Sequence, residues 1–149
     1  MSYFVTGGTG FIGRFLIGNL LKRKGSIHVL VRKASMKKFD AMVKKQGWDP
    51  KRVIAVPGDM TAANCGLTAA QVRALTAKIQ HFFHLAAIYD LTASAAEQQA
   101  ANIDGTQHAL DLAAALKVKC FHHASSIAAA GLYPGVFRED MFDEAEGLD

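Results

Sequence analysis

A glycine-rich loop near the start of the chain has the spacing that dinucleotide chemistry requires. It follows a short apolar segment, opens a helical pattern, and carries a glycine at every third residue. In that setting the first glycine allows a tight turn, the second lets a pyrophosphate approach the backbone, and the third allows close helix packing. The N-terminus of the following helix can then hold the anion. We therefore assign a dinucleotide site, rather than a ligand-free turn, to Gly7, Thr9, Gly10, Phe11, Ile12 and Gly13.

Two basic residues, Arg32 and Lys33, follow the next apolar segment. Rossmann domains that prefer NAD usually carry an acid at this place, about 20 residues after the loop, which bonds the adenosine ribose hydroxyls. A carboxylate there would repel a 2′-phosphate, whereas a guanidinium can bind it through two hydrogen bonds. The pair therefore predicts NADP(H) as the cofactor in preference to NAD. The alternative interpretation is a solvated basic surface.

The histidines and cysteines do not form a recognisable metal motif. His122 and His123 are adjacent on an expected strand, so their side chains point to opposite faces and cannot readily bind one ion. His84 has no second ligand at zinc-like spacing. Cys65 and Cys120 are too few for a disulfide framework and indicate free thiols in a reducing compartment. We predict no metal.

These residues are placed by apolar segments that alternate with helical patterns. The five expected strands are rich in β-branched or aromatic residues, and helical spacing or composition marks the segments between them. We expect strands at 2–6, 27–31, 53–56, 81–85 and 119–124. We expect helices from Phe11 to an end at Gly25, and over 35–46, 68–77 and 92–117.

Strands alternating with helices indicate right-handed βαβ units and a parallel sheet covered on both faces. We predict an α/β fold, a doubly wound parallel sheet of the Rossmann type that stops after about five strands. Residues 1–131 would form the NADP(H)-binding domain. Residues 132–149 would form an acidic segment that leads toward a missing catalytic region.

The composition also restricts the class of protein to which the chain can belong. The chain has 149 residues, half of them hydrophobic, and a net charge of +4. It has no apolar stretch of membrane-spanning length and no leader pattern, so we expect a cytoplasmic protein. Eleven Lys or Arg lie between Lys22 and Arg52, but neither interleaved aromatic residues nor a nucleic-acid motif accompanies them. We expect no nucleic-acid partner, and the sequence does not indicate an oligomeric state.

Five ordered motifs together resemble the extended short-chain dehydrogenases. They are Thr6-Gly7-Gly8-Thr9-Gly10-Phe11-Ile12-Gly13, Gly58-Asp59-Met60, His84-Leu85-Ala86-Ala87, Asn102-Ile103-Asp104-Gly105-Thr106 and Ser125-Ser126. Within that family, the segments 84–90, 122–131 and 137–142 are similar to those of bacterial fatty acyl-CoA or acyl-ACP reductases. The resemblance spans essentially the whole chain.

The resemblance also implies roles for individual residues. Asp59 and Met60 would lie beside the adenine, and Leu85, Ala86 and Ala87 beside the ribose and nicotinamide. For catalysis, Asn102 would help to organise a water and the family's lysine. Ser126 would bond the substrate carbonyl, with Ser125 as the nearby alternative.

One part of the family's site has no counterpart here. The family completes its site with Tyr-x-x-x-Lys, but Tyr3, Tyr89 and Tyr133 are followed four positions later by glycine, alanine and phenylalanine. The resemblance therefore implies the N-terminal part of a longer protein, inactive on its own.

Three functions follow from these observations. The first is NADPH-dependent reduction of a fatty acyl-CoA, an acyl-ACP or a fatty aldehyde, with a small molecule or acyl thioester as partner. The second is another extended dehydrogenase that acts on a nucleotide sugar or a ketone. The third is an NADPH-binding sensor or scaffold without chemistry, for which a missing tyrosine–lysine pair would be the expected signature.

Overall fold

The five predicted strands form one parallel sheet. The computed structural model describes residues 1–90 and 92–141. The strands are β1 (Ser2–Thr6), β2 (Ile27–Val31), β3 (Val53–Pro57), β4 (Ile79–His84) and β5 (Cys120–His123). Their order in the sheet is β3-β2-β1-β4-β5, and all four neighbouring pairs are parallel. The order reverses direction after β3, which confirms the predicted doubly wound α/β fold.

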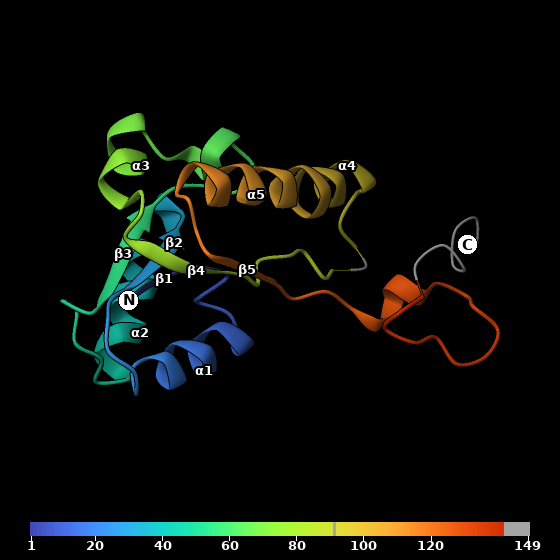
Figure 1. Cartoon of the computed structure of the whole chain (residues 1–149), viewed down its shortest axis with the longest axis horizontal. Helices are drawn as coiled ribbons and strands as arrows, with labels where there is room; N and C mark the ends of the chain where they lie inside the picture. The colour runs from blue at the N-terminus through green and yellow to red at the C-terminus, as the bar shows by residue number, and fades with distance from the viewer. Residues whose placement is uncertain (91, 142–149) are drawn as a thin grey trace.

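Helices cover both faces of the sheet (Figure 1). On one face lie α1 (Phe11–Leu20) and α2 (Met36–Lys45), and on the other lie α3 (Ala69–Leu75), α4 (Ala95–Gln98) and α5 (Gly105–Ala115). The central strand β1 is therefore buried from both sides, and its side chains alternate between two cores. Tyr3 and Val5 pack on the α1–α2 face, while Phe4 packs on the α5 face.

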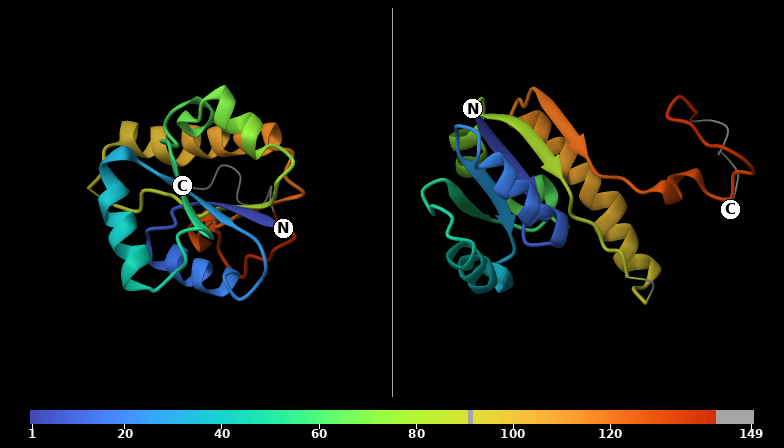
Figure 2. Two further views of the ribbon diagram at one scale, coloured as in Figure 1. Left: turned by 90° about the vertical axis from the view of Figure 1, so that its left-hand side faces the viewer. Right: turned by 90° about the horizontal axis from the view of Figure 1, so that it is seen from below.

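Two helical segments differ from the predicted bounds. The first helix ends at Leu20, and turns carry the chain to Gly25, whose φ of +113° suits glycine. The region 92–117 is divided into α4, a π-helix over Gln99–Asp104 and α5. Together they form one continuous rod (Figure 2). The alanine-rich composition predicts the helical region, but it does not predict the π-helix within it.

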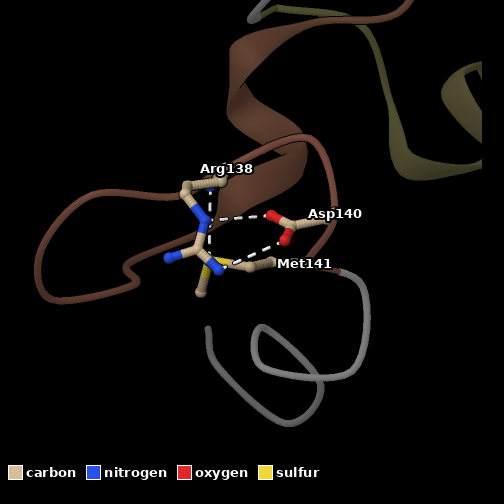
Figure 3. A network of polar contacts seen from close by, with 3 residues as sticks. All are labelled: Arg138, Asp140 and Met141. Carbon is tan, nitrogen blue, oxygen red and sulfur yellow. Dashed lines mark hydrogen bonds and ion pairs between the residues drawn. The ribbon is translucent and has the colours of Figure 1, made fainter.

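The chain leaves the sheet after β5 (Figure 2). It forms a short 3-10 helix over Ile127–Ala130 and then a loop in which Arg138 pairs with Asp140 at 3.0 Å (Figure 3). Met141 is buried, and its sulfur accepts a hydrogen bond from the Arg138 amide at 3.3 Å. The ion pair is exposed, so it contributes little to stability. The rest of the predicted acidic segment, 142–149, lies outside the described residues. No helix in the described part of the chain is long and apolar enough to cross a membrane.

Candidate functional site

The glycine loop makes a tight turn between β1 and α1. Gly7 has a φ of +70°, and the Gly10 amide donates to the Gly7 carbonyl at 3.0 Å. A Cβ on Gly7 would lie 2.7 Å from the Ala86 nitrogen, so the loop is pressed against the end of β4. A Cβ on Gly10 would meet only the Gly7 carbonyl oxygen, at 3.2 Å. The turn thus leaves open space beside Gly10, where a ligand backbone can approach.

Gly8 and Gly13 bring the helix close to the loop and the sheet. A Cβ on Gly13 would overlap the Gly7 carbonyl oxygen and lie 2.6 Å from the Gly8 Cα. A Cβ on Gly8 would lie 2.5 Å from Cγ1 of Val29 on β2. Gly13 therefore packs the helix against the loop, and Gly8 packs the loop against β2. Gly8 is absent from the predicted site, although it stands inside the glycine cluster that marks the loop.

The N-terminus of α1 is free to receive an anion. Its N-cap is Gly10, no side chain caps the first amides, and no acid lies in the first turn. Uncapped amides and the helix dipole together favour a negatively charged ligand. The side chains of Phe11 and Ile12 are 70% and 62% exposed, and Phe11 packs on Phe15 at 5.2 Å between ring centroids. These two residues contribute backbone, rather than side chains, to the loop.

A cleft of about 330 Å³ lies at the carboxyl ends of the strands. This is the edge at which open α/β sheets bind ligands. Nine of the predicted cofactor residues line it: Gly7, Thr9, Gly10, Arg32, Asp59, Met60, Leu85, Ala86 and Ala87. Six further residues complete the lining, namely Leu30, Val31, Ser35, Thr61, Ile88 and Ala101. The cleft therefore brings residues from four strand ends to one place.

The basic pair borders this cleft at the end of β2. Arg32 lines it, and both Arg32 and Lys33 line an adjoining hollow of about 320 Å³ beside Gly58 and Asp59. Both side chains are exposed, and neither forms an ion pair with any carboxylate of residues 1–90 and 92–141. Their charges are therefore available to a phosphate group.

Asp59 has a structural role in the turn that follows β3. Its carboxylate accepts hydrogen bonds from the amide and the hydroxyl of Thr61, at 3.0 and 2.9 Å. Its amide donates to the Cys65 carbonyl at 2.8 Å. Asn64, Cys65 and Gly66 all have left-handed φ angles, between 50° and 71°. The turn thus fixes Asp59 at the rim of the cleft, an arrangement that local sequence patterns do not predict.

The two thiols of the chain should differ in reactivity. Cys65 is fully buried, and burial, followed by the charges of Asp59 and Asp111, raises its pKa to about 12. Cys120 is half-buried on β5. Since the thiolate is the reactive form, we expect Ellman's reagent at about pH 8 to label only Cys120 in the folded protein. Cys120→Ser should remove the rapid reaction, and rapid labelling of Cys65 in that variant would contradict the prediction.

A buried histidine links the glycine loop to β4 and α5. His84 is 1% exposed, and its Nδ1 lies 2.8 Å from the Thr6 hydroxyl, while its Nε2 lies 3.2 Å from the Thr106 hydroxyl. The Thr6 oxygen also accepts the amides of Leu85 and Ala86, each at 3.2 Å. Burial, followed by the charge of His123, lowers the pKa of His84 to about 4. His84 is therefore neutral and holds the cleft wall in place. From the sequence alone, His84 is part of the His84-Leu85-Ala86-Ala87 motif and lacks a second metal ligand, but neither observation predicts its bonds to Thr6 and Thr106.

Asn102 clamps the loop after β4. Its side-chain oxygen accepts from the Ile88 amide at 2.8 Å, and its side-chain nitrogen donates to the Ile88 carbonyl at 2.9 Å. Its own carbonyl, in the π-helix, accepts from the hydroxyl of Thr106 on α5 at 2.6 Å. The side chain predicted to organise a catalytic water is thus bound to the backbone N–H and C=O of Ile88.

Ser125 and Ser126 follow β5 and are exposed. The Ser126 oxygen accepts from the Ala128 amide at 3.2 Å and caps the short 3-10 helix. Because the oxygen is the acceptor there, its hydroxyl proton remains available. Neither serine lines the cleft that holds the cofactor residues. The structure therefore brings nine of the thirteen predicted cofactor residues together in the cleft, but neither of the predicted catalytic serines lines it.

Comparison with known proteins gives a family for this arrangement. A family model described as male sterility protein, an NAD-binding family, matches residues 5–147. A linear gramicidin synthase of Brevibacillus parabrevis is 35% identical over 132 residues, which cover 83% of this chain and 3% of that protein. A candidate fatty acyl-CoA reductase of Drosophila melanogaster is 30% identical over 129 residues, which cover 76% of this chain and 23% of that protein.

A solved structure agrees with these relatives. The terminal R domain of the myxalamid PKS-NRPS biosynthetic pathway superposes with a TM-score of 0.81 at 27% identity. The match covers 94% of this chain and 39% of that one. The chain thus spans well under half of the relatives and of the solved domain that it matches.

Proposed function

Since the chain belongs to the male sterility family of NAD(P)-binding reductases, within the extended short-chain dehydrogenases, we propose that it forms the NADP(H)-binding part of an acyl-thioester reductase. The observation that carries the proposal is the cleft at the carboxyl ends of β1 to β4. There the open backbone at Gly10, the uncapped N-terminus of α1, and Arg32, which forms no ion pair within residues 1–90 and 92–141, lie around one space.

We expect a dinucleotide to lie along the cleft. The pyrophosphate would lie on the first turn of α1, where the backbone amides have no side-chain cap. Asp59 and Met60 would flank the adenine, and Leu85 to Ala87 would flank the ribose next to the nicotinamide. Arg32 and Lys33 would bind the 2′-phosphate, and the absence of an acid at this place favours NADP(H) over NAD.

The chain's own residues supply part of the reaction. Bound NADP(H) would provide the hydride, and the hydroxyl of Ser126 would donate a hydrogen bond to the substrate carbonyl oxygen, with Ser125 as the alternative donor. A donor already aimed at an oxygen that gains charge stabilises the transition state. Asn102 would position the loop after β4 through Ile88. No tyrosine–lysine pair stands at the family's spacing in the 149 residues, so we expect this chain to bind cofactor without turnover.

Calorimetric titration of the chain with NADPH and NADH tests the cofactor assignment. Arg32→Ala removes a charge-assisted contact of about 1.5–3 kcal/mol, so we expect the NADPH affinity to fall about 10- to 150-fold and the NADH affinity to stay unchanged. Lys38→Ala removes one charge from the same basic stretch, outside the cleft, and is the matched control. Equal losses of NADPH affinity in Arg32→Ala and Lys38→Ala would mean that NADPH responds to the total charge of the basic stretch and not to a specific contact with Arg32.

The substrate class is tested on the full-length gene product. We expect NADPH oxidation with acyl-CoA or with an acyl group on a carrier protein, and none with nucleotide sugars or small ketones. Turnover of a sugar or ketone instead would assign the protein to another branch of the extended dehydrogenases. A full-length product that binds NADPH but turns over neither class would be a sensor or scaffold.

A further inference from the structure

Three side chains with metal-binding atoms meet on the sheet face that carries α1 and α2. His81 lies on β4, and Cys120 and His122 lie on β5. None of them lines the cofactor cleft, and the function proposed above uses none of them. We propose that these three residues bind a divalent transition-metal ion of the Zn²⁺ class, with the fourth position open to solvent.

The sheet register brings the three residues together. His81 is paired with Cys120, and Phe83 with His122, in the parallel β4–β5 ladder. Residues two apart on a strand point to the same face, so Cys120 and His122 project together beside His81. Tyr3, on the α1–α2 face of β1, lies 6.0 Å from His81 between ring centroids, which places the cluster on that face.

The distances are close to those of a metal site. Nδ1 of His81 lies 3.1 Å from Nε2 of His122, and Sγ of Cys120 lies 4.0 Å from Nδ1 of His122. With one ligand atom from each residue, all separations are within 4.8 Å. Bonds of about 2.0 Å to nitrogen and 2.3 Å to sulfur would place tetrahedral ligands about 3.3–3.6 Å apart. Because the two contacts use opposite ring nitrogens of His122, a single ion requires side-chain rotations that bring one nitrogen of His122 and the other two ligand atoms from within 4.8 Å to this spacing.

The donor set selects the kind of ion. Two imidazoles and one thiolate suit Zn²⁺ and related ions, whereas Mg²⁺ and Ca²⁺ prefer oxygen ligands. Three protein ligands and one open position are typical of zinc sites that keep a water. The two strands form a firm support, and the ring of Phe83 stacks on His122 at 4.3 Å, which restrains that imidazole.

The cluster is also accessible. His81, Cys120 and His122 are each half-buried. The core on this face includes Phe83 at its margin, and within the described ranges no residue of β5 belongs to it. An ion can therefore reach the cluster without opening the fold.

The proposed site departs from the prediction of no metal made from the sequence, but it is consistent with the exclusion of a His122–His123 pair. His123 points to the other face and stacks on His84 at 5.4 Å. Sequence patterns alone cannot join His81 to Cys120 and His122, which lie 39 and 41 positions away, because these contacts depend on the β4–β5 register. The competing explanation is a hydrogen bond between His81 and His122 that needs no metal.

Titration of the reduced chain with Co²⁺ tests the site. We expect one equivalent to produce the near-ultraviolet charge-transfer band of a cobalt thiolate, and Zn²⁺ to displace it. Cys120→Ser should abolish the band. Removal of a residue that only hydrogen-bonds to a metal ligand costs about 10- to 100-fold in metal affinity. His81→Ala and His122→Ala each remove a proposed ligand, so each should weaken Co²⁺ binding more than tenfold. His123→Ala, the neighbour on the opposite face, should leave it unchanged.

A second measurement needs no variant. One equivalent of Zn²⁺ should slow the reaction of Cys120 with Ellman's reagent more than tenfold, and a chelator should restore it. Absence of both the cobalt thiolate band and thiol protection would overturn the proposal in favour of the metal-free hydrogen bond. A band that persists in Cys120→Ser would equally overturn it.

Discussion

Gly13→Ala is expected to abolish dinucleotide binding by this chain, whereas Gly18→Ala in the same helix is expected to preserve it. A methyl group at position 13 would overlap the Gly7 carbonyl oxygen and approach the Gly8 Cα at 2.6 Å. These neighbours are backbone atoms that fix the turn, so the helix must move away from the loop. Such overpacking costs about 1–3 kcal/mol, and the displaced amides no longer converge on the pyrophosphate. We expect at least a 30-fold loss of NADPH affinity, about 2 kcal/mol.

The control separates this effect from helix propensity. A Cβ on Gly18 would meet nothing within 4 Å, and alanine in a helix interior is about 1 kcal/mol more favourable than glycine. Gly18→Ala should therefore raise the melting temperature and leave the NADPH affinity unchanged. Calorimetric titration and thermal unfolding of both variants make the comparison. Wild-type affinity in a folded Gly13→Ala protein would refute the proposed place of the pyrophosphate.

Stability should fall as the pH decreases from about 6.5 to about 4, and His84 should account for much of the fall. Above pH 6.5 the imidazole is neutral in both the folded and the unfolded chain, so it makes no difference to stability. Below pH 6.5 the unfolded chain binds a proton that His84, with its pKa lowered to about 4, does not bind in the folded chain. By linkage, the free energy of unfolding then decreases by about 3 kcal/mol across this window and levels off below it.

Urea unfolding at pH 7.5 and at pH 5 measures this effect. His84→Gln removes the titrating group. The free energy of unfolding should therefore fall less between pH 7.5 and pH 5 in this variant than in the wild type. His28 also has a lowered pKa, caused first by burial and then by Lys78, so His28→Gln shows how much another histidine contributes. In the wild type, the His84 NMR signals should not titrate above about pH 5. Titration of His84 near pH 6.5 would show that the Thr6–His84–Thr106 network is open in solution.

The sequence predicts the strands and the glycine loop well because both depend on local patterns. β1 and β2 have the predicted bounds, since apolar β-branched or aromatic residues fill them and glycine or basic residues end them. The bounds of α1 are less predictable. Residues 21–25 continue the composition of the helix, but the chain must turn there to bring β2 beside β1.

The remaining parts of the site depend on contacts between distant segments. The bonds of His84 to Thr6 and Thr106 join three elements, and no spacing along the chain specifies them. The left-handed run at Asn64 and Cys65 is unusual for non-glycine residues, so propensity argues against it. The hydrogen bonds between Asn102 and Ile88 also depend on the tertiary fold, because Ile88 lies fourteen residues earlier in the chain. Each of these features requires the sheet order before it can be inferred.

The two edges of the sheet are unequal, and this controls where another strand could add. At one edge, the Gly58 amide points inward to Val31 on β2, so the preceding residue, Pro57, faces outward and offers no donor. The other edge is β5, a strand of four residues without proline. Exposed strand edges are templates for β-augmentation, and proline blocks them. The sheet can therefore be extended more readily on the β5 side, where no proline is present, than on the β3 side, where Pro57 lacks an outward donor, whether the added strand comes from the same polypeptide or from a second molecule.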